Sequence, residues 1–270
     1  MIYLTCDLHH DTLQTGNQKF SDRNELSLAL DFAKELKNRD INATFFFTGR
    51  SLHEEPEKVI PIMNFKNIEV GGHTYNAFEP QLFHRIWKKL TGNYNGPYFY
   101  EYLDVWHTKK IIKEKLGVSI KVWRNHMYMH GKNTNKILAR NGIKLCSDGV
   151  KKGALNKNNV QDGVLNIPIN IIPDHEHLIH AERTEDWIKS WIKRYNWSDD
   201  FGSDSYYIKD WEKLVINQIV ENESLGLDSV IIIHPITMYL CDNFEAIYRI
   251  LDIVKNYNSG KMSDLIGEKK

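Results

Sequence analysis

The sequence has little cysteine and no segment suited to crossing a membrane. Its three cysteines, Cys6, Cys146 and Cys241, are odd in number and have no CxxC spacing, which argues against both a disulfide framework and a thiolate zinc site. No run of about 18 apolar residues occurs, and no charged and apolar leader precedes the first apolar run, so we expect neither a membrane span nor an export signal. These absences predict a cytoplasmic protein.

The chain also lacks an excess of charge of either sign. Its 35 basic and 35 acidic residues balance, so no overall field would attract nucleic acid or an anionic membrane, although a local patch could still do so. Neither a GxGxxG nor a GxxxxGKS/T loop is present, which argues against nucleotide binding. A chain of 270 residues can bury one sizeable core, and we expect one domain over residues 1–258 and a polar tail over 259–270.

What the sequence does contain is a set of apolar, strand-like runs that end in reactive side chains. In parallel α/β folds, catalytic and binding groups collect at the carboxyl ends of the strands, so we expect the side chains that end these runs to converge on one pocket. The end residues are Asp7, His9 and His10 after 2–6, His73 after 68–72, Arg124 and His126 after 120–123, Asp148 after 143–147, and His234 after 230–233. The pair Gly71 and Gly72 indicates a tight turn or a close backbone approach just before His73.

Helical patterns separate these runs. An amphipathic helix is expected from Glu25 to about Asn38, and others over 80–90, 101–116, 134–141, 186–197, 206–226 and 244–257. Because strands and helices alternate, we expect a parallel sheet, and the number of strand ends favours a barrel. Two further expectations concern single residues: Trp187, Trp191 and Trp197 should form a buried helix face, and His53, His84 and His107 should lie on the surface.

In order and spacing, these residues resemble the polysaccharide deacetylase family, the NodB-homology domain of metal-dependent carbohydrate N-deacetylases. The resemblance covers residues 1–258. It includes the strand end Thr5-Cys6-Asp7, the strand 43–49, the tripeptide Gly72-His73-Thr74, Arg124, and His234-Pro235. The resemblance implies a distorted (β/α) barrel, a divalent metal, and hydrolysis of an N-acetyl group on an amino sugar.

Two positions depart from the metal site that the resemblance implies. The family's first motif supplies two acids, and here Asp7 matches the base while the second position holds Leu8, or His9 if one residue is inserted. The second motif places two histidines four residues apart, but His73 is followed by Ala77. The metal is therefore either lost or held differently.

Imidazole binds zinc and related ions well, so a histidine can replace a missing carboxylate. We predict His9, His73 and His126 as ligands of a divalent ion, with zinc first and cobalt, nickel or manganese as alternatives. The segment 174–180, Asp-His-Glu-His-Leu-Ile-His, is another source of the third ligand.

The resemblance also suggests catalytic roles. Asp7 would act as base, held by Arg124, and His234 as acid, while Asp148 would orient His234 or Arg124 and backbone N–H groups beyond His126 would hold the oxyanion. Simpler structural roles remain open, such as an ion pair between Asp7 and Arg124 or a strand cap at His234. The candidate substrate-binding residues are His10, Asp174, His175, His177 and Tyr128.

The expected function is that of an intracellular metal-dependent hydrolase that removes an N-acetyl group from an amino sugar or glycan precursor in surface-polysaccharide metabolism. A nucleotide- or lipid-linked sugar, or another small N-acylated metabolite, fits better than finished polymer. One alternative is a catalytically inactive glycan-binding or scaffold protein, which Leu8 and Ala77 favour. Another is a hydrolase of a formyl group or of a carbon–nitrogen bond in a non-sugar.

Overall fold

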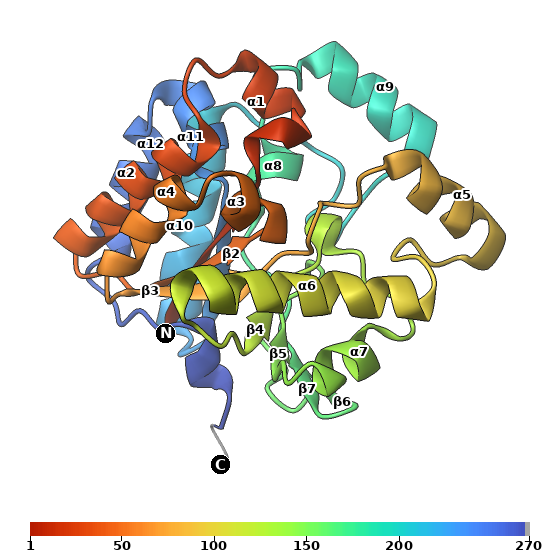
Figure 1. The fold of residues 1–270 in the computed structure, drawn as a ribbon. Coiled ribbons are helices and arrows are strands. Elements are labelled where there is room, and N and C mark those ends of the chain that lie inside the picture. Colours follow the sequence, from red (N-terminus) through yellow and green to blue (C-terminus); the bar gives the residue numbers. More distant parts are fainter. Residues whose placement is uncertain (268–270) are drawn as a thin grey trace.

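The computed structural model describes residues 1–267, which form one eight-stranded sheet surrounded by helices (Figure 1). The strands are β1 (Ile2–Leu8), β2 (Ala43–Phe47), β3 (Ile68–Gly72), β4 (Val122–Trp123), β5 (Leu145–Cys146), β6 (Val160–Gln161), β7 (Val164–Asn166) and β8 (Ser229–Ile233). Their order is β6-β7-β5-β4-β3-β2-β1-β8. Every neighbouring pair is parallel except β6 and β7, so the carboxyl ends of the main strands share one edge.

Helices alternate with these strands, as the sequence predicts. They are α1 (Gly16–Phe20), α2 (Glu25–Asn38), α3 (Gly49–Glu54), α4 (Pro56–Val59), α5 (Gln81–Thr91), α6 (Tyr98–Leu116), α7 (Thr134–Arg140), α8 (Asp174–His177), α9 (Glu185–Tyr195), α10 (Ile208–Ser224), α11 (Pro235–Asp242) and α12 (Glu245–Val254). Helix α2 begins at the expected residue because the Asn24 side chain accepts hydrogen bonds from the backbone N–H groups of Leu26 and Ser27. Among residues 1–267, no helix combines the length and the hydrophobicity that a bilayer-spanning segment requires.

The sheet curls into a distorted barrel whose last gap is bridged without a regular strand. The strand expected over 164–172 is regular only as far as Asn166. Beyond it, the backbone N–H groups of Asn170 and Ile171 donate to the carbonyl oxygen of Val230 in β8 at 3.2 and 3.3 Å. The Asn170 side chain in turn accepts the Val230 N–H at 2.7 Å. The predicted distorted (β/α) fold is confirmed, with an amide side chain substituting for part of a strand.

The glycine pair before His73 lies inside β3 and does not form a turn. A Cβ atom on Gly71 would lie 2.4 Å from the Phe46 ring, and one on Gly72 would lie 2.4 Å from the Trp123 ring. Glycine is therefore needed for close packing between neighbouring strands, which is the second of the two reasons the sequence suggested. The strand β3 therefore continues without a turn up to the residue before His73.

The polar tail expected from residue 259 is packed against the barrel as far as residue 267. The N–H of Gly260 donates to the carbonyl oxygen of Ile2 at 2.9 Å, which adds a parallel bridge beside β1. Met262 and Leu265 are buried in an apolar cluster with Tyr3. Residues 268–270 lie outside the described residues.

Candidate metal centre

Three histidine side chains converge at the carboxyl ends of β1, β3 and β4. The Nδ1 atom of His126 lies 3.1 Å from Nε2 of His9 and 3.4 Å from Nε2 of His73. All three nitrogens lie within 4.8 Å of one another. The structure therefore brings together the three residues that the sequence analysis named as ligands.

Neighbouring oxygens orient two of these rings. The Nδ1 atom of His9 lies 3.0 Å from Oε1 of Glu25, and Nδ1 of His73 lies 3.0 Å from the carbonyl oxygen of Arg124. Because each oxygen accepts the Nδ1 proton, the lone pair on each Nε2 faces the centre. Burial, with the nearby His9, lowers the pKa of His73 and of His126 well below the usual range.

Zinc and related ions bind to imidazole nitrogens that face one point in this way. Because Nδ1 of His9 and Nδ1 of His73 already contact oxygens, the three facing nitrogens share a proton only when His126 Nδ1 carries it. The donor set fits a divalent ion, and hydrogen bonds to oxygen orient two of its three rings, those of His9 and His73.

A buried ion pair between Asp7 and Arg124 lies next to the three histidines. Arg124 donates from Nη1 to Asp7 Oδ1 at 2.8 Å, and its other groups bind Thr5 and Ser147. The second carboxylate oxygen, Asp7 Oδ2, lies 3.7 Å from Nε2 of His73. Arg124 thus holds Asp7 as predicted, and the free oxygen of Asp7 faces the centre.

His234 forms the opposite wall, and Asp174 orients it. The Oδ1 atom of Asp174 lies 2.7 Å from Nδ1 of His234, and its Oδ2 atom accepts a hydrogen bond from the His234 backbone N–H at 2.6 Å. Burial lowers the pKa of His234, but the charge and hydrogen bond of Asp174 outweigh it and raise the pKa to about 9. The His234 ring stacks on that of His9 with centroids 6.4 Å apart. His234 therefore carries a proton at neutral pH.

Asp148 does not contact His234 or Arg124, and the role expected for it is wrong. Its Oδ1 accepts the backbone N–H of Asn125 at 2.7 Å, and its Oδ2 lies 2.8 Å from both Asn125 Nδ2 and His130 Nδ1. Asp148 therefore fixes the residue that precedes His126. The orienting role belongs to Asp174, which the sequence analysis had assigned to substrate binding.

The remaining substrate-binding candidates divide into two groups. The His175 ring lies 5.5 Å from that of His234. The buried Tyr128 hydroxyl has no hydrogen-bond partner among residues 1–267, and burial together with the charges of Glu176 and Asp7 raises its pKa. The side-chain hydrogen bonds of the other two candidates, His10 and His177, are with residues outside the three-histidine cluster. His10 Nδ1 lies 3.2 Å from the Thr48 hydroxyl, and both ring nitrogens of His177 contact the segment 199–204.

Sequence reasoning missed one residue near the centre, named a second only as part of the segment 174–180, and misplaced a third. Glu25 holds His9, and Glu176 is an acid whose burial raises its pKa and whose Oε2 has no partner in the described part of the chain. In the sequence, Glu25 looks like any other acid at the start of a helix. Only its burial, which the sequence does not show, distinguishes it as a residue of the site. His84 was expected on the surface but is buried against Phe78, whose ring lies 6.0 Å from that of His126.

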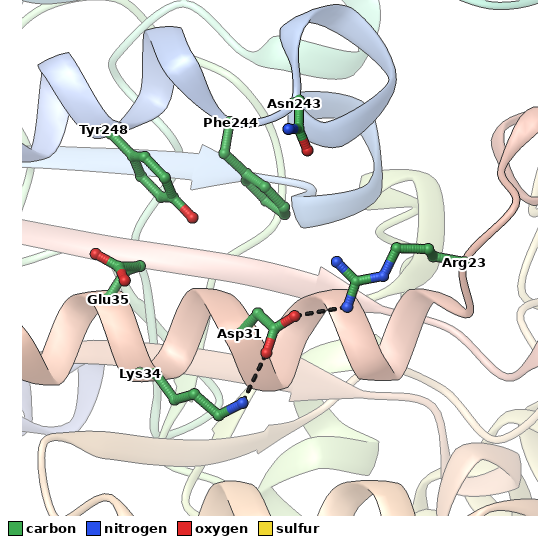
Figure 2. Close-up of a pocket in the computed structure, with 7 residues that line it drawn as sticks. All are labelled: Arg23, Asp31, Lys34, Glu35, Asn243, Phe244 and Tyr248. Carbon is green, nitrogen blue, oxygen red and sulfur yellow. Dashed lines mark hydrogen bonds and ion pairs between the residues drawn. The ribbon is translucent and has the colours of Figure 1, made fainter.

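A separate surface hollow of about 310 Å³ lies between α2 and the start of α12 and contains none of the predicted site residues. Figure 2 shows Asp31 bound by Arg23 and Lys34 beneath the Phe244 and Tyr248 rings. These charges neutralise one another at the surface, and exposed ion pairs of this kind contribute little to stability. The hollow is therefore not a candidate for the predicted metal site, which lies at the histidine cluster.

Comparisons with known proteins agree with this description at the level of the fold. No family model matches the sequence, and no curated protein matches it. A structure assigned as a polysaccharide deacetylase from Mycobacterium smegmatis is 16% identical, with 98% of this chain and 88% of that chain covered and a TM-score of 0.67. The Puue allantoinase is 12% identical, with 98% and 88% covered and a TM-score of 0.65.

A CE4 family pseudoenzyme from Bacillus anthracis also matches, at 15% identity, with 100% of this chain and 66% of that chain covered and a TM-score of 0.54. The architecture is thus a distorted (β/α) barrel with a histidine cluster at the carboxyl ends of its strands. More narrowly, its fold is that of the polysaccharide deacetylases, at low sequence identity. The fold that the sequence resemblance implied is confirmed.

Proposed function

We propose that this protein is a metal-dependent hydrolase that removes an N-acetyl group from an amino sugar or a glycan precursor. The observation that supports the proposal is the convergence of three oriented imidazole nitrogens between Asp7 and His234. Several structures with the same fold are named as polysaccharide deacetylases. The choice of an acetyl group and a sugar as substrate rests on that likeness in fold. The proposed metal ligands and the groups that transfer protons are assigned from the residues of this chain.

His9, His73 and His126 would hold the ion, with zinc as the first candidate and cobalt, nickel or manganese as the alternatives. When bound, such an ion polarises a carbonyl group and lowers the pKa of water. Asp7 accepts the proton of the attacking water on Oδ2, because Arg124 already occupies Oδ1.

His234 donates the proton that the leaving nitrogen needs. Asp174 holds His234 Nδ1, which leaves Nε2 to carry the transferable proton. Overall, water adds to the carbonyl carbon, the carbon–nitrogen bond breaks, and acetate and a free amine result. His234 starts in the protonated state that a general acid requires, because its pKa is raised to about 9, and Asp7 is paired with Arg124.

The developing negative charge on the carbonyl oxygen needs a hydrogen-bond donor. Of the backbone N–H groups beyond His126, which were expected for this task, those of Tyr128 and Met129 already donate to the carbonyl oxygens of Asn125 and His126. Burial and nearby acids raise the pKa of the Tyr128 phenol well above its usual range, so its hydroxyl keeps its proton. We assign the Tyr128 hydroxyl to this role because it is a buried donor with no hydrogen-bond partner among residues 1–267, and Asp7 is among the acids that raise the pKa of its phenol.

The first test is metal content. Wild-type protein purified without added metal should contain about one equivalent of a transition metal by elemental analysis, as expected for one three-histidine site. His9→Ala and His73→Ala should lose it, whereas the exposed His53→Ala should retain it. The metal-loaded wild type should then release acetate from N-acetylglucosamine oligomers. Metal-free wild type that takes up no zinc, cobalt or nickel on titration would refute the proposal.

A second candidate function is that of a catalytically inactive glycan-binding protein. Leu8 is buried in the core, and Ala77 occupies the place of the family's second histidine. One structure with this fold is itself named a pseudoenzyme. Sugar binding by a wild-type protein that neither holds metal nor releases acetate would favour this second function.

A further inference from the structure

Helix α5 carries an exposed apolar stripe beside a row of cations. Leu82, Ile86 and Leu90 recur every fourth residue and are 69%, 52% and 74% exposed. Arg85 and Lys89, also four apart, form the neighbouring row on the helix surface. Lys88 adds a third cation, and the helix contains no aspartate or glutamate. An apolar face flanked by basic residues is typical of helices that lie in the interface of a lipid bilayer.

The attachment of α5 leaves this stripe free and places it near the candidate centre. His84 is the buried residue of the helix, and its position two residues from Leu82 and Ile86 puts it on the opposite face. The His84 ring packs on Phe78 with centroids 4.9 Å apart, and the Phe78 ring lies 6.0 Å from that of His126. One aromatic side chain therefore separates the anchor of α5 from a predicted metal ligand.

Helix α9 presents a second exposed row on the His234 side of the centre. Trp187 and Tyr195 are 37% and 55% exposed. Trp191 and Trp197 are only partly buried, so the three tryptophans do not form the fully buried face that the sequence predicted. The Arg183 guanidinium lies 4.9 Å from the Trp187 ring and donates to the carbonyl oxygen of Glu176, next to His175. In Figure 1, α5 and α9 both project at the periphery of the molecule. Tryptophan and tyrosine are the side chains enriched at membrane interfaces.

We propose that α5, assisted by α9, docks this protein on the surface of an anionic lipid bilayer, beside the mouth of the histidine centre. The apolar stripe would enter the headgroup region, while Arg85, Lys88 and Lys89 contact the lipid phosphates. The overall charge is balanced, so the attraction comes from this local patch. Cations next to the stripe match a negatively charged surface better than a neutral protein groove. This inference concerns binding and does not depend on the proposed reaction.

The test is co-sedimentation of the full chain with vesicles. The protein should bind vesicles of phosphatidylcholine mixed with phosphatidylglycerol at least about tenfold more strongly than pure phosphatidylcholine, and added salt should weaken the binding. The triple variant Leu82→Gln, Ile86→Gln, Leu90→Gln should lose at least about tenfold in binding, because glutamine keeps helix propensity and removes the apolar stripe. Substituting Arg85, Lys88 and Lys89 with glutamine should remove the salt dependence.

A matched control replaces three other exposed hydrophobic residues that lie outside α5 and α9. Ile60, Val160 and Leu225 are 47%, 56% and 63% exposed, and their triple glutamine variant should bind vesicles like the wild type. Circular dichroism should show the same helix content in all variants. Absence of vesicle binding by the wild type, or equal binding by the stripe variant, would overturn the proposal. So would stripe-dependent self-association without vesicle binding, which would make α5 a contact between two copies of the chain.

Discussion

Glu25 Oε1 lies 3.0 Å from both the backbone nitrogen and the ring Nδ1 of His9. Its other oxygen accepts a hydrogen bond from Gln18 Nε2 at 2.8 Å. A carboxylate in this position fixes the tautomer of a ligating histidine and makes its free nitrogen more basic. The resemblance implied an acid as a direct ligand. In this protein the acid, Glu25, instead binds Nδ1 of His9, and it is the His9 Nε2 atom that faces the centre.

Replacing Glu25 with glutamine should therefore weaken zinc binding by about 10- to 100-fold, because the amide no longer fixes the Nδ1 proton as firmly. Competition against a chelating dye measures this affinity. Glu55→Gln is the matched control, since Glu55 is also buried but binds Asn24 and the backbone of Asp11. Equal zinc affinity in the Glu25 variant and the wild type would refute the role given to Glu25.

The ion pair of Arg124 and Asp7 should be important for stability as well as for activity. Arg124→Met would leave the Asp7 carboxylate buried without its partner, and we expect the free energy of unfolding to fall by about 3–5 kcal/mol. Urea unfolding measures the change. Arg249→Met, which removes a half-exposed arginine paired with Glu212, should cost about 0–1 kcal/mol. Similar losses in the two variants would contradict this account.

The sequence was sufficient to predict the long central strands and the residues at their ends, but not the length of the short strands such as β7. Apolar runs such as 2–6 and 230–233 are buried on both faces of a parallel sheet, so their pattern and their terminal histidines are directly visible. His9, His73 and His126 meet because parallel strands align their carboxyl ends. Local pattern and topology together determine this part of the site.

Partners contributed by loops and helix starts could not be predicted in the same way. Asp148 and Asp174 both follow apolar segments, and only the three-dimensional path decides that Asp174 reaches His234 while Asp148 reaches Asn125. Glu25 is separated from His9 by a loop whose course the sequence does not encode locally. The prediction of a buried tryptophan face was wrong for a related reason. A four-residue spacing shows which side chains share a helix face, but not whether another part of the protein covers that face.

Asp174 and His234 should act as one unit. His234→Ala is expected to lower kcat by about 100- to 10,000-fold, the usual contribution of a general acid, and Asp174→Asn should have a loss of similar size. The double variant should lose little more than His234→Ala alone, because Asp174 acts through His234. Acetate release at saturating substrate gives the three values. Additive losses in the double variant would mean that Asp174 acts independently of His234.

Asp104 should make the stability of the protein depend on pH. Both of its carboxylate oxygens accept the N–H of Tyr75, at 3.0 and 3.1 Å. Burial nevertheless raises the pKa of Asp104 from 3.8 to about 7, more than this hydrogen bond lowers it. Between these two pH values the folded protein keeps a proton on Asp104 that the unfolded chain has lost. The contribution of Asp104 to the free energy of unfolding is therefore complete below pH 3.8 and is lost as the pH rises to about 7.

The free energy of unfolding should therefore contain a component that falls by up to about 1.4 kcal/mol per pH unit between about pH 4 and 7. Asp104→Asn keeps an oxygen for the Tyr75 N–H but has no titrating proton, so its curve should be flatter than that of the wild type across this window. Urea unfolding at several pH values measures both curves, with the exposed Asp210→Asn as the control that should follow the wild type. Parallel curves for wild type and Asp104→Asn would show that Asp104 is already ionised in the folded protein at low pH.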